Sequence, residues 1–295
     1  MSITLNMVGG GSAELEATDA VLRVQAPAGA IVTISKGTTT KSDAGHENAD
    51  DSSVYDYYFI IHQSQFDSVD PWTAVASLNG KTASKTIIIN IADEYDLVLD
   101  ELLSTTYQRV EYLQSSGTQA INTGVYYSDH IEIDVDFMWT ALTHDTDIIG
   151  AEGGNAYAIV FNVYDNNKNR LIVGTTTGTS TSGQSYATNT RYYGQLYTET
   201  HTWLYINGEQ WNYDGDSVTS NYPLGLFCRN ANGTLSNKAS CRIYSCKITK
   251  SGTLERNFIP CYRKADTVAG MYDIVHDVFY TNQGSGTFVV GSDVG

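Results

Sequence analysis

The last fifty residues of the chain read as a series of short strands joined by tight turns. Arg242–Ile248 alternates apolar and polar residues, Lys250–Gly252 supplies a turn, and Thr253–Pro260 returns. Met271–Asp273 and Val278–Tyr280 form a further pair. Period-two alternation broken by glycine and asparagine predicts half-buried antiparallel strands. We therefore expect a β-sheet to be completed by this stretch.

The composition favours an all-β fold for the whole chain. Among its 295 residues are 21 tyrosines, 26 glycines and only four prolines, and 41% are hydrophobic. Tyrosine and threonine suit the half-buried surface of a pleated sheet, and glycine supplies turns. A chain of this length accommodates two domains with separate cores. We expect two β-sandwiches in series.

The first hundred residues contain predicted strands at the spacing of a small sandwich. Ala20–Ala26 and Ala30–Ser35 are joined by a proline–glycine turn, whereas Lys41–Ser53 is polar and is predicted to be a surface loop. Asn79-Gly80 tolerates positive φ angles and therefore predicts a two-residue hairpin after Trp72–Leu78. We predict one domain over residues 1–100 and a linker near residues 101–106.

The second domain is predicted over residues 107–295. Ile131–Met138 alternates cleanly, and the Asn207-Gly208 dipeptide predicts another two-residue hairpin. In that hairpin Ile206 pairs with Glu209 and Leu204 with Trp211, so these four side chains share one face. The side chains predicted on the other face are Trp203, Tyr205, Gln210 and Asn212.

Several segments of the second domain resemble concanavalin A-like, laminin-G-type β-sandwiches found in structural and adhesive proteins of bacterial phages and prophages. These segments are YLQSSGTQ at 112–119, INTG at 121–124, RIYSCKI at 242–248, RNFIPCYRK at 256–264, GMYD at 270–273 and VFYTNQGSGTF at 278–288. The first domain is similar to the small Ig-like modules of phage tail and surface proteins, through APAGAIVTISKG at 26–37 and LNGKTASKT at 78–86. These resemblances imply an N-terminal Ig-like β-sandwich followed by a concanavalin A-like jelly roll.

The net charge of the sequence and its lack of targeting segments limit the partners that we expect. With 33 acidic and 17 basic residues the formal net charge is −16, which repels phosphate backbones and makes nucleic acid a poor partner. No secretory signal and no apolar run long enough to span a bilayer is present in the sequence. We expect synthesis in a host bacterial cytoplasm, without membrane insertion.

The four cysteines, Cys228, Cys241, Cys246 and Cys261, lack the spacing of a zinc site. Cys241 and Cys246 are five residues apart on one predicted strand, so we expect their side chains to face opposite ways and not to bond to each other. Buried free thiols are predicted.

Glu132, Asp134 and Asp136 are the strongest catalytic candidates in the sequence, because alternate carboxylates on a strand project to one face. Some concanavalin-fold glycosidases carry a similar E-x-D-x-E strand, but here the last residue is Asp136, one methylene shorter. Polar residues also face solvent on an ordinary antiparallel strand. No catalytic residue is therefore assigned, and a glycan depolymerase using Glu132 and Asp136 is kept as an alternative.

No metal or cofactor is assigned. Asp165-x-Asn167-x-Asn169 begins like a calcium loop, but Arg170 and Thr176 stand where that loop needs glycine and glutamate, so we expect a hairpin turn. Asp145-Thr146-Asp147 and Asp214-Gly215-Asp216 are acidic turns that could supply oxygens to calcium. The six histidines are scattered and match no catalytic motif.

Carbohydrate binding is the remaining chemistry, since sugars need an aromatic platform beside amides or carboxylates. Two groups of residues have this mixture, and the alternative for both is a place in the core or at a subunit interface. They are Trp203, Tyr205, Gln210 and Asn212 on the hairpin, and Arg229 and Asn230 further along the chain.

By resemblance, the sequence predicts a non-enzymatic phage virion protein, an appendage, fibre or decoration of head or tail, exposed on the virion surface. The first domain would join other virion proteins, the second would bind host-surface glycans, and a homo-oligomer is expected because tethered weak sites raise avidity. A structural coat component without a ligand is the other alternative.

Overall fold

The computed structural model of the chain describes residues 2–6, 12–16, 18–91, 94–98, 103–154, 156–174, 180–198, 202–213 and 218–294. Within these residues the regular structure is strand, apart from two single 3-10 turns, η1 (Gln63–Gln65) and η2 (Asp165–Asn167). The all-β class predicted from the sequence is therefore confirmed. The Ig-like assignment of the first module stays a prediction.

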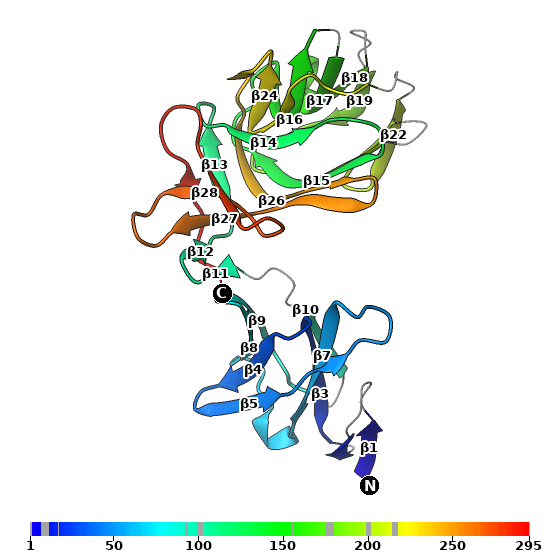
Figure 1. Cartoon of the computed structure of the whole chain (residues 1–295), viewed down its shortest axis with the longest axis vertical. Coiled ribbons are helices and arrows are strands. Elements are labelled where there is room, and N and C mark those ends of the chain that lie inside the picture. Colours follow the sequence, from blue (N-terminus) through cyan, green and yellow to red (C-terminus); the bar gives the residue numbers. More distant parts are fainter. Residues whose placement is uncertain are drawn as a thin grey trace. The chain divides into compact units, whose positions relative to one another are not determined.

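The chain divides into two compact units between Thr105 and Thr106. The first unit holds a sheet in the order β10-β3-β7-β6 and a second in the order β11-β9-β8-β4-β5, and β1 pairs with β2 separately (Figure 1). Its strands are β1 (Ser2–Asn6), β2 (Ser12–Glu16), β3 (Ala20–Pro27), β4 (Ile31–Lys36), β5 (Thr39–Asp43), β6 (His46–Glu47), β7 (Val54–Ile61), β8 (Trp72–Leu78), β9 (Lys81–Ile87), β10 (Glu94–Val98) and β11 (Leu103–Ser104).

The two larger sheets of the first unit share one hydrophobic core. Leu22 and Tyr57 from one sheet and Ile34 and Trp72 from the other are all buried in it. The predicted Asn79-Gly80 hairpin is present, with both residues at positive φ and Leu78 opposite Lys81.

The prediction of a loop over Lys41–Ser53 is wrong at its start. Residues 39–43 form β5, an edge strand beside β4, and His46–Glu47 forms β6 beside β7. Three of the five β5 residues are exposed, so the strand carries no apolar alternation that the sequence could reveal. Backbone pairing at a sheet edge tolerates such a polar strand.

The second unit is built on an eleven-stranded sheet that follows the order β22-β21-β20-β15-β26-β27-β28-β29, with β12, β13 and β30 paired off this path. Its strands are β12 (Tyr107–Arg109), β13 (Leu113–Ser116), β15 (Ile131–Trp139), β20 (Arg191–Thr198), β21 (Thr202–Ile206), β22 (Glu209–Tyr213), β26 (Ser240–Lys250), β27 (Thr253–Arg263), β28 (Ala269–Asp273), β29 (Val278–Thr281) and β30 (Val289–Val290).

A six-stranded sheet in the order β19-β18-β17-β16-β24-β25 covers the other side of the core, and β14 pairs with β23. These strands are β14 (Ile121–Tyr126), β16 (Thr146–Gly153), β17 (Ala156–Val163), β18 (Lys168–Gly174), β19 (Ser180–Ser185), β23 (Pro223–Leu226), β24 (Cys228–Ala231) and β25 (Thr234–Ser236).

The two sheets of the second unit pack their inner faces together as a sandwich. Ile133 and Phe137 of the large sheet lie in one buried cluster with Val160 and Leu171 of the smaller one. The predicted alternation of β15 is confirmed, because its odd-numbered residues from Ile131 to Phe137 are buried and the intervening acidic residues are only partly buried.

A β-bulge in β26 corrects one expectation about the cysteines. Ile243 is opposite Phe137 and Ser245 is opposite Asp136, so Tyr244 is an extra residue on its strand. A bulge shifts the alternation by one residue. Cys241 and Cys246, which a regular strand would point to opposite faces, are therefore both fully buried. The prediction of buried free thiols is confirmed for all four cysteines.

The segment after Thr175 also differs from the prediction. The threonine, glycine and serine residues of Thr176–Ser185 predict a loop, but residues 180–185 form β19 beside β18. Strand β20 was not predicted at all, although Tyr192, Gly194, Leu196 and Thr198 are buried in alternation with more exposed residues. This strand lies between β15 and β21 in the large sheet and proves important for the candidate site.

Candidate functional site

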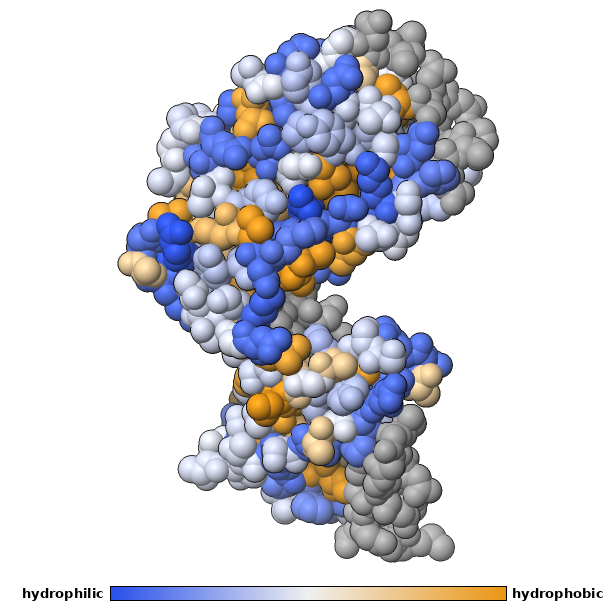
Figure 2. All heavy atoms as spheres, viewed as in Figure 1, coloured by the Kyte–Doolittle hydropathy of each residue, from blue (hydrophilic) through white to orange (hydrophobic). Residues whose placement is uncertain are grey.

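The candidate site is the outer face of the large sheet where β15, β20, β21 and β22 lie side by side (Figure 1). Their inward residues belong to the core, so the alternate residues face away from it. In the view of Figure 2 the surface of both units is mainly hydrophilic, with hydrophobic residues in scattered patches between.

The β21–β22 hairpin adopts the predicted register. Tyr205 is opposite Gln210 and Trp203 is opposite Asn212, whereas Leu204 and Ile206 are buried in the core. The structure thus brings the first predicted group together on the outer face, with Trp203 and Tyr205 half-buried and Gln210 exposed. The side chain of Asn212 lies outside the described part of the chain.

Strand β20 extends this surface with side chains that the sequence reasoning missed. Tyr197 is opposite Trp203, and Gln195 is opposite Tyr205. Tyr193 is 45% exposed at the other end of the strand. We name Tyr193, Tyr197, Trp203 and Tyr205 the aromatic belt. The missed signal was the alternation of buried and exposed positions over 191–198, where Gly194 in an inward position weakens the hydrophobic pattern.

Strand β15 places three carboxylates along one side of the aromatic belt. Its outer residues Glu132, Asp134 and Asp136 are opposite Tyr197, Gln195 and Tyr193 respectively. We name these three carboxylates the acidic flank. The catalytic alternative and the binding candidates of the sequence therefore lie on one continuous face, although they come from distant segments.

Two of the three carboxylates are held by neighbouring side chains. Asp134 Oδ1 accepts hydrogen bonds from Gln195 Nε2 at 2.8 Å and from the Tyr193 hydroxyl at 3.2 Å. Partial burial, followed by the nearby Asp134 charge, raises the pKa of Tyr193 to about 12, so its hydroxyl remains a donor at neutral pH. Asp136 accepts from Nε and Nη2 of Arg191 at 2.8 and 2.6 Å.

Glu132 differs from the other two carboxylates. No hydrogen bond joins it to another of the described residues, and it lines a cavity of about 380 Å³. His130, Tyr197, Ser251 and Gly252 complete the described lining. Since Tyr197 also belongs to the aromatic belt, this cavity opens at one end of the belt and brings an acceptor-only carboxylate to it.

The spacing of Glu132 and Asp136 bears on the catalytic alternative. Residues 132 and 136 lie four positions apart on one strand, so their Cα atoms are about 13 Å apart. Glycoside hydrolysis needs two carboxyl groups about 5–5.5 Å apart for retention or about 6.5–9.5 Å apart for inversion, so both side chains would have to extend toward each other. Asp136 instead forms a bidentate pair with Arg191, as the geometry of its two hydrogen bonds shows.

Arg229 and Asn230 lie elsewhere, on β24 of the six-stranded sheet, and both are buried. Arg229 donates to Asp147, Glu152 and Asp145 at 3.0, 2.6 and 2.9 Å, and Asn230 Nδ2 donates to the Pro223 carbonyl oxygen at 2.9 Å. The structure therefore does not bring this second predicted group near the aromatic belt. Its hydrogen-bond donors link neighbouring strands.

Arg229 is the centre of a buried ionic network. Asp147 has no solvent-exposed surface and accepts a second hydrogen bond from Asn162 Nδ2 at 2.6 Å. Asp145 also receives hydrogen bonds from Arg170 and from Asn237. Burial raises the pKa of Asp147 to about 6, against the opposing effect of the Arg229 charge. The carboxylates of Asp145 and Asp147, which the sequence left as possible oxygen donors without assigning a metal, are paired with these arginines.

Metal-binding geometry is absent from the described residues, where no cluster of three or more His, Cys, Asp or Glu side chains is arranged to hold an ion. Asp165-Asn166-Asn167 forms the predicted turn between β17 and β18, with two of its residues at positive φ. The Asp214–Asp216 turn lies outside the described residues.

Within the described part of the chain, no helix has the length and hydrophobicity needed to cross a bilayer.

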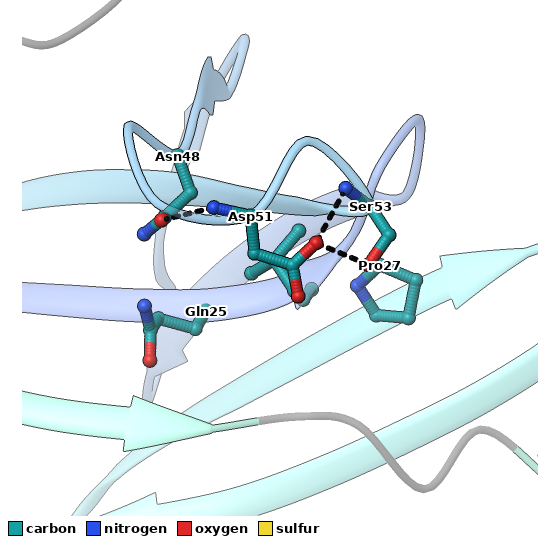
Figure 3. A pocket seen from close by; sticks show the side chains of 7 residues that line it. Gln25, Pro27, Asn48, Asp51 and Ser53 are labelled. Carbon is teal, nitrogen blue, oxygen red and sulfur yellow. Dashed lines mark hydrogen bonds between the residues drawn. The ribbon is translucent and has the colours of Figure 1, made fainter. Parts of the chain in front are cut away.

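A larger cavity of about 540 Å³ lies in the first unit, between β3 and the loop before β7 (Figure 3). Its polar side chains mostly bond locally: Asp51 accepts from the backbone N–H and the hydroxyl of Ser53, and Asn48 Oδ1 accepts from the Asp51 N–H. Asn48 and Gln25 donate to Asp56. Because these groups already satisfy each other, the outer face of the second unit is the stronger candidate.

No protein family model matches the sequence, and no curated protein matches it either. Two solved structures align with nearly the whole chain. One is a Bacteroides ovatus protein assigned provisionally to carbohydrate binding, at 10% identity and a TM-score of 0.48, covering 99% of this chain and 97% of that chain. The other is the mouse laminin α1 chain, domains LG4-5, at 11% identity and a TM-score of 0.41, covering 94% and 88%. Likenesses this distant carry no functional weight here.

Proposed function

We propose that the second unit binds glycans on the outer face of its large sheet. The observation that carries this proposal is the aromatic belt, with carboxylates on one side and Gln210 on the other. Sugar rings have apolar C–H faces that stack on aromatic rings and hydroxyl edges that need hydrogen-bond partners. The belt and its flanks supply both kinds of contact on neighbouring strands.

The proposed activity is binding without catalysis. Two of the acidic residues are engaged with Arg191, Tyr193 and Gln195, which supports a positioning role for them rather than acid–base chemistry. A glycan depolymerase using Glu132 and Asp136 is the competing hypothesis. Release of reducing ends from a polysaccharide, lost in Glu132→Gln, would support that hypothesis against ours.

The biological setting we propose is the surface of a phage virion, as an appendage, fibre or decoration of head or tail. The sequence resemblance to phage structural and adhesive proteins supports this setting. The first unit would join other virion proteins and the second would meet glycans of the host bacterium. A homo-oligomer would multiply weak sites into useful avidity. Portal, tail or capsid genes beside this reading frame would support the virion setting, and their absence would count against it.

A glycan array probed with the full chain tests the binding proposal. We expect the wild-type protein to bind a subset of glycans and Trp203→Ala to lose at least about fivefold in affinity, the usual scale for an important stacking residue. Tyr126→Ala is the matched control, because Tyr126 is 46% exposed but lies on β14, outside the belt. A flat array, or equal binding by Trp203→Ala, would contradict the proposal and favour a structural coat component without a ligand.

A further inference from the structure

The arrangement of side chains on the outer face indicates which class of glycan it would bind. This inference rests on the proposed function. The aromatic belt runs along its strands rather than forming a single ring-sized platform. Tyr193 and Tyr197 are four residues apart on β20, so their Cα atoms are separated by about 13 Å. On β21, Trp203 is opposite Tyr197, about 5 Å away across the sheet, and Tyr205 is opposite Gln195, between the positions of the two tyrosines. This surface is longer than one sugar ring.

The two sides of the belt differ in hydrogen-bond chemistry. The acidic flank offers carboxylates, which accept hydrogen bonds and cannot donate them while ionised. Gln210, on the other side, carries an amide that can both donate and accept. A ligand that lies along the belt must therefore present hydroxyl donors toward β15. Glu132, which lines the terminal cavity, is the carboxylate best placed to receive one.

The charge of this face disfavours acidic sugars. Three carboxylates line one side of the belt, and Arg191 is paired with one of them, Asp136. Among the described residues of β26, Lys247 lies opposite Asp134, and Lys250 and Arg242 lie opposite Ile131 and Met138, at the two ends of the row of carboxylates. A uronic or sialic acid would bring a further carboxylate close to Glu132 and Asp134, where like charges repel. Neutral and amino sugars avoid this repulsion.

We infer that the outer face binds an internal stretch of a neutral glycan, more than one ring long and aligned with β20 and β21, with a hydroxyl donated to Glu132. Recognition of an internal stretch follows from the length of the belt and from its open position on the sheet face. Exclusion of acidic sugars follows from the acidic flank. The alignment of the glycan with β20 and β21 follows from the placement of the aromatic residues on these two adjacent strands.

Calorimetric titration of the full chain tests these statements. The probes are oligosaccharides of glucose, galactose, mannose and xylose with one to six rings, beside galacturonate and glucuronate oligomers of the same lengths. We expect affinity for one neutral series to rise at least about tenfold between one and four rings, and the acidic counterparts to bind at least about tenfold more weakly at low salt. Added salt should narrow that second difference, because it screens exposed charges.

Glu132→Gln separates charge from shape, since glutamine retains an acceptor oxygen. This variant should bind the neutral series more weakly than the wild type, because a neutral amide oxygen accepts a weaker hydrogen bond than a carboxylate, and should bind the acidic series more tightly than the wild type does. Single rings binding as well as longer chains, or acidic chains binding better than neutral ones, would overturn this inference while leaving glycan binding intact. Absence of binding to every series and to the array would overturn the proposed function itself.

Discussion

Replacing Arg229 by methionine tests whether the ionic network holds the six-stranded sheet together. Arg229 donates three hydrogen bonds to carboxylates that belong to β16 or to the turn before it, and its side chain is only 9% exposed. Methionine keeps much of the apolar volume but none of the donors. The substitution leaves Asp147, which has no exposed surface, without its cationic partner.

The expected loss is large. Removing one partner of a buried ion pair typically costs about 3–5 kcal/mol, because the remaining charge stays buried without compensation. For a unit that spans Thr106–Val294, each kcal/mol lowers the melting temperature by about 2–4 °C, so the melting temperature should fall by about 6–20 °C. The double variant Arg229→Met/Asp147→Asn should recover part of this loss, because it removes the uncompensated charge as well.

The loss should also depend on pH. Burial raises the pKa of Asp147 to about 6, above its value of about 4 in the unfolded chain. The folded protein therefore binds this proton more tightly, and the associated stability is present below about pH 4 and lost as the pH rises through 6. The positive charge of Arg229 lowers the pKa of Asp147. Removing Arg229 therefore raises this pKa further, and the stability that the bound proton contributes persists to higher pH. Arg229→Met should consequently be more damaging at pH 8 than at pH 5.

Urea unfolding followed by tryptophan fluorescence measures these changes, because three of the four tryptophans, Trp139, Trp203 and Trp211, lie in the second unit. Arg263→Ala is the control, since Arg263 forms an exposed pair with Asp266 and its loss should leave the midpoint unchanged. A loss below about 1 kcal/mol, or an equal loss at both pH values, would refute the account of Asp147 as an uncompensated buried charge.

Three further predictions concern packing. Burial raises the pKa of Cys228 and Cys261 to about 12, and Cys241 and Cys246 are fully buried as well. We therefore expect none of the four thiols to react with a disulfide reagent at pH 8 until denaturant is added. Rapid reaction of the native protein would show that at least one thiol is accessible. Gly194→Ala would place a Cβ too close to the Phe161 ring and should lower stability by about 1–3 kcal/mol in urea titrations, whereas an unchanged midpoint would mean that the ring turns aside. Tyr57→Phe removes the 2.6 Å hydrogen bond to the Ala30 carbonyl and should destabilise the first unit by about 1–3 kcal/mol, whereas an unchanged midpoint would mean that water replaces the hydroxyl.

The sequence predicted those parts of the fold in which a local pattern and the tertiary packing agree. Strand β15 has clean alternation, and the two Asn-Gly turns fix the register of their hairpins without help from distant residues. For this reason the shared face of Trp203 and Tyr205 followed from the sequence alone, whereas the sequence left open whether that face belongs to the core or to the surface. Their role in binding is still a prediction, because register fixes where a side chain points and not what it binds.

The sequence could not reveal features that depend on neighbouring strands. The bulge at Tyr244 exists because β26 pairs with β15 on one side, and it reverses the facing of Cys246. Strand β5 is polar and gains its place from backbone bonds at a sheet edge. Strand β20 was overlooked because Gly194 interrupts its inward apolar positions, where the bulky Phe161 ring fills the space.

The fate of the two predicted binding groups shows why composition alone does not identify a site. Arg229 and Asn230 have suitable polar chemistry, but the fold buries both and directs their donors to neighbouring strands. Trp203 and Tyr205 of the hairpin lie beside strand β20, which contributes two tyrosines to the aromatic belt. Glu132, on the strand after that, lines a cavity. A ligand can use only those groups whose hydrogen-bonding capacity the fold has left available, because breaking a buried internal bond would cost more than the new contact provides. By this criterion the carboxylate of Glu132, on the outer face of the large sheet, is a better starting point for recognition than the ionic network of the smaller sheet.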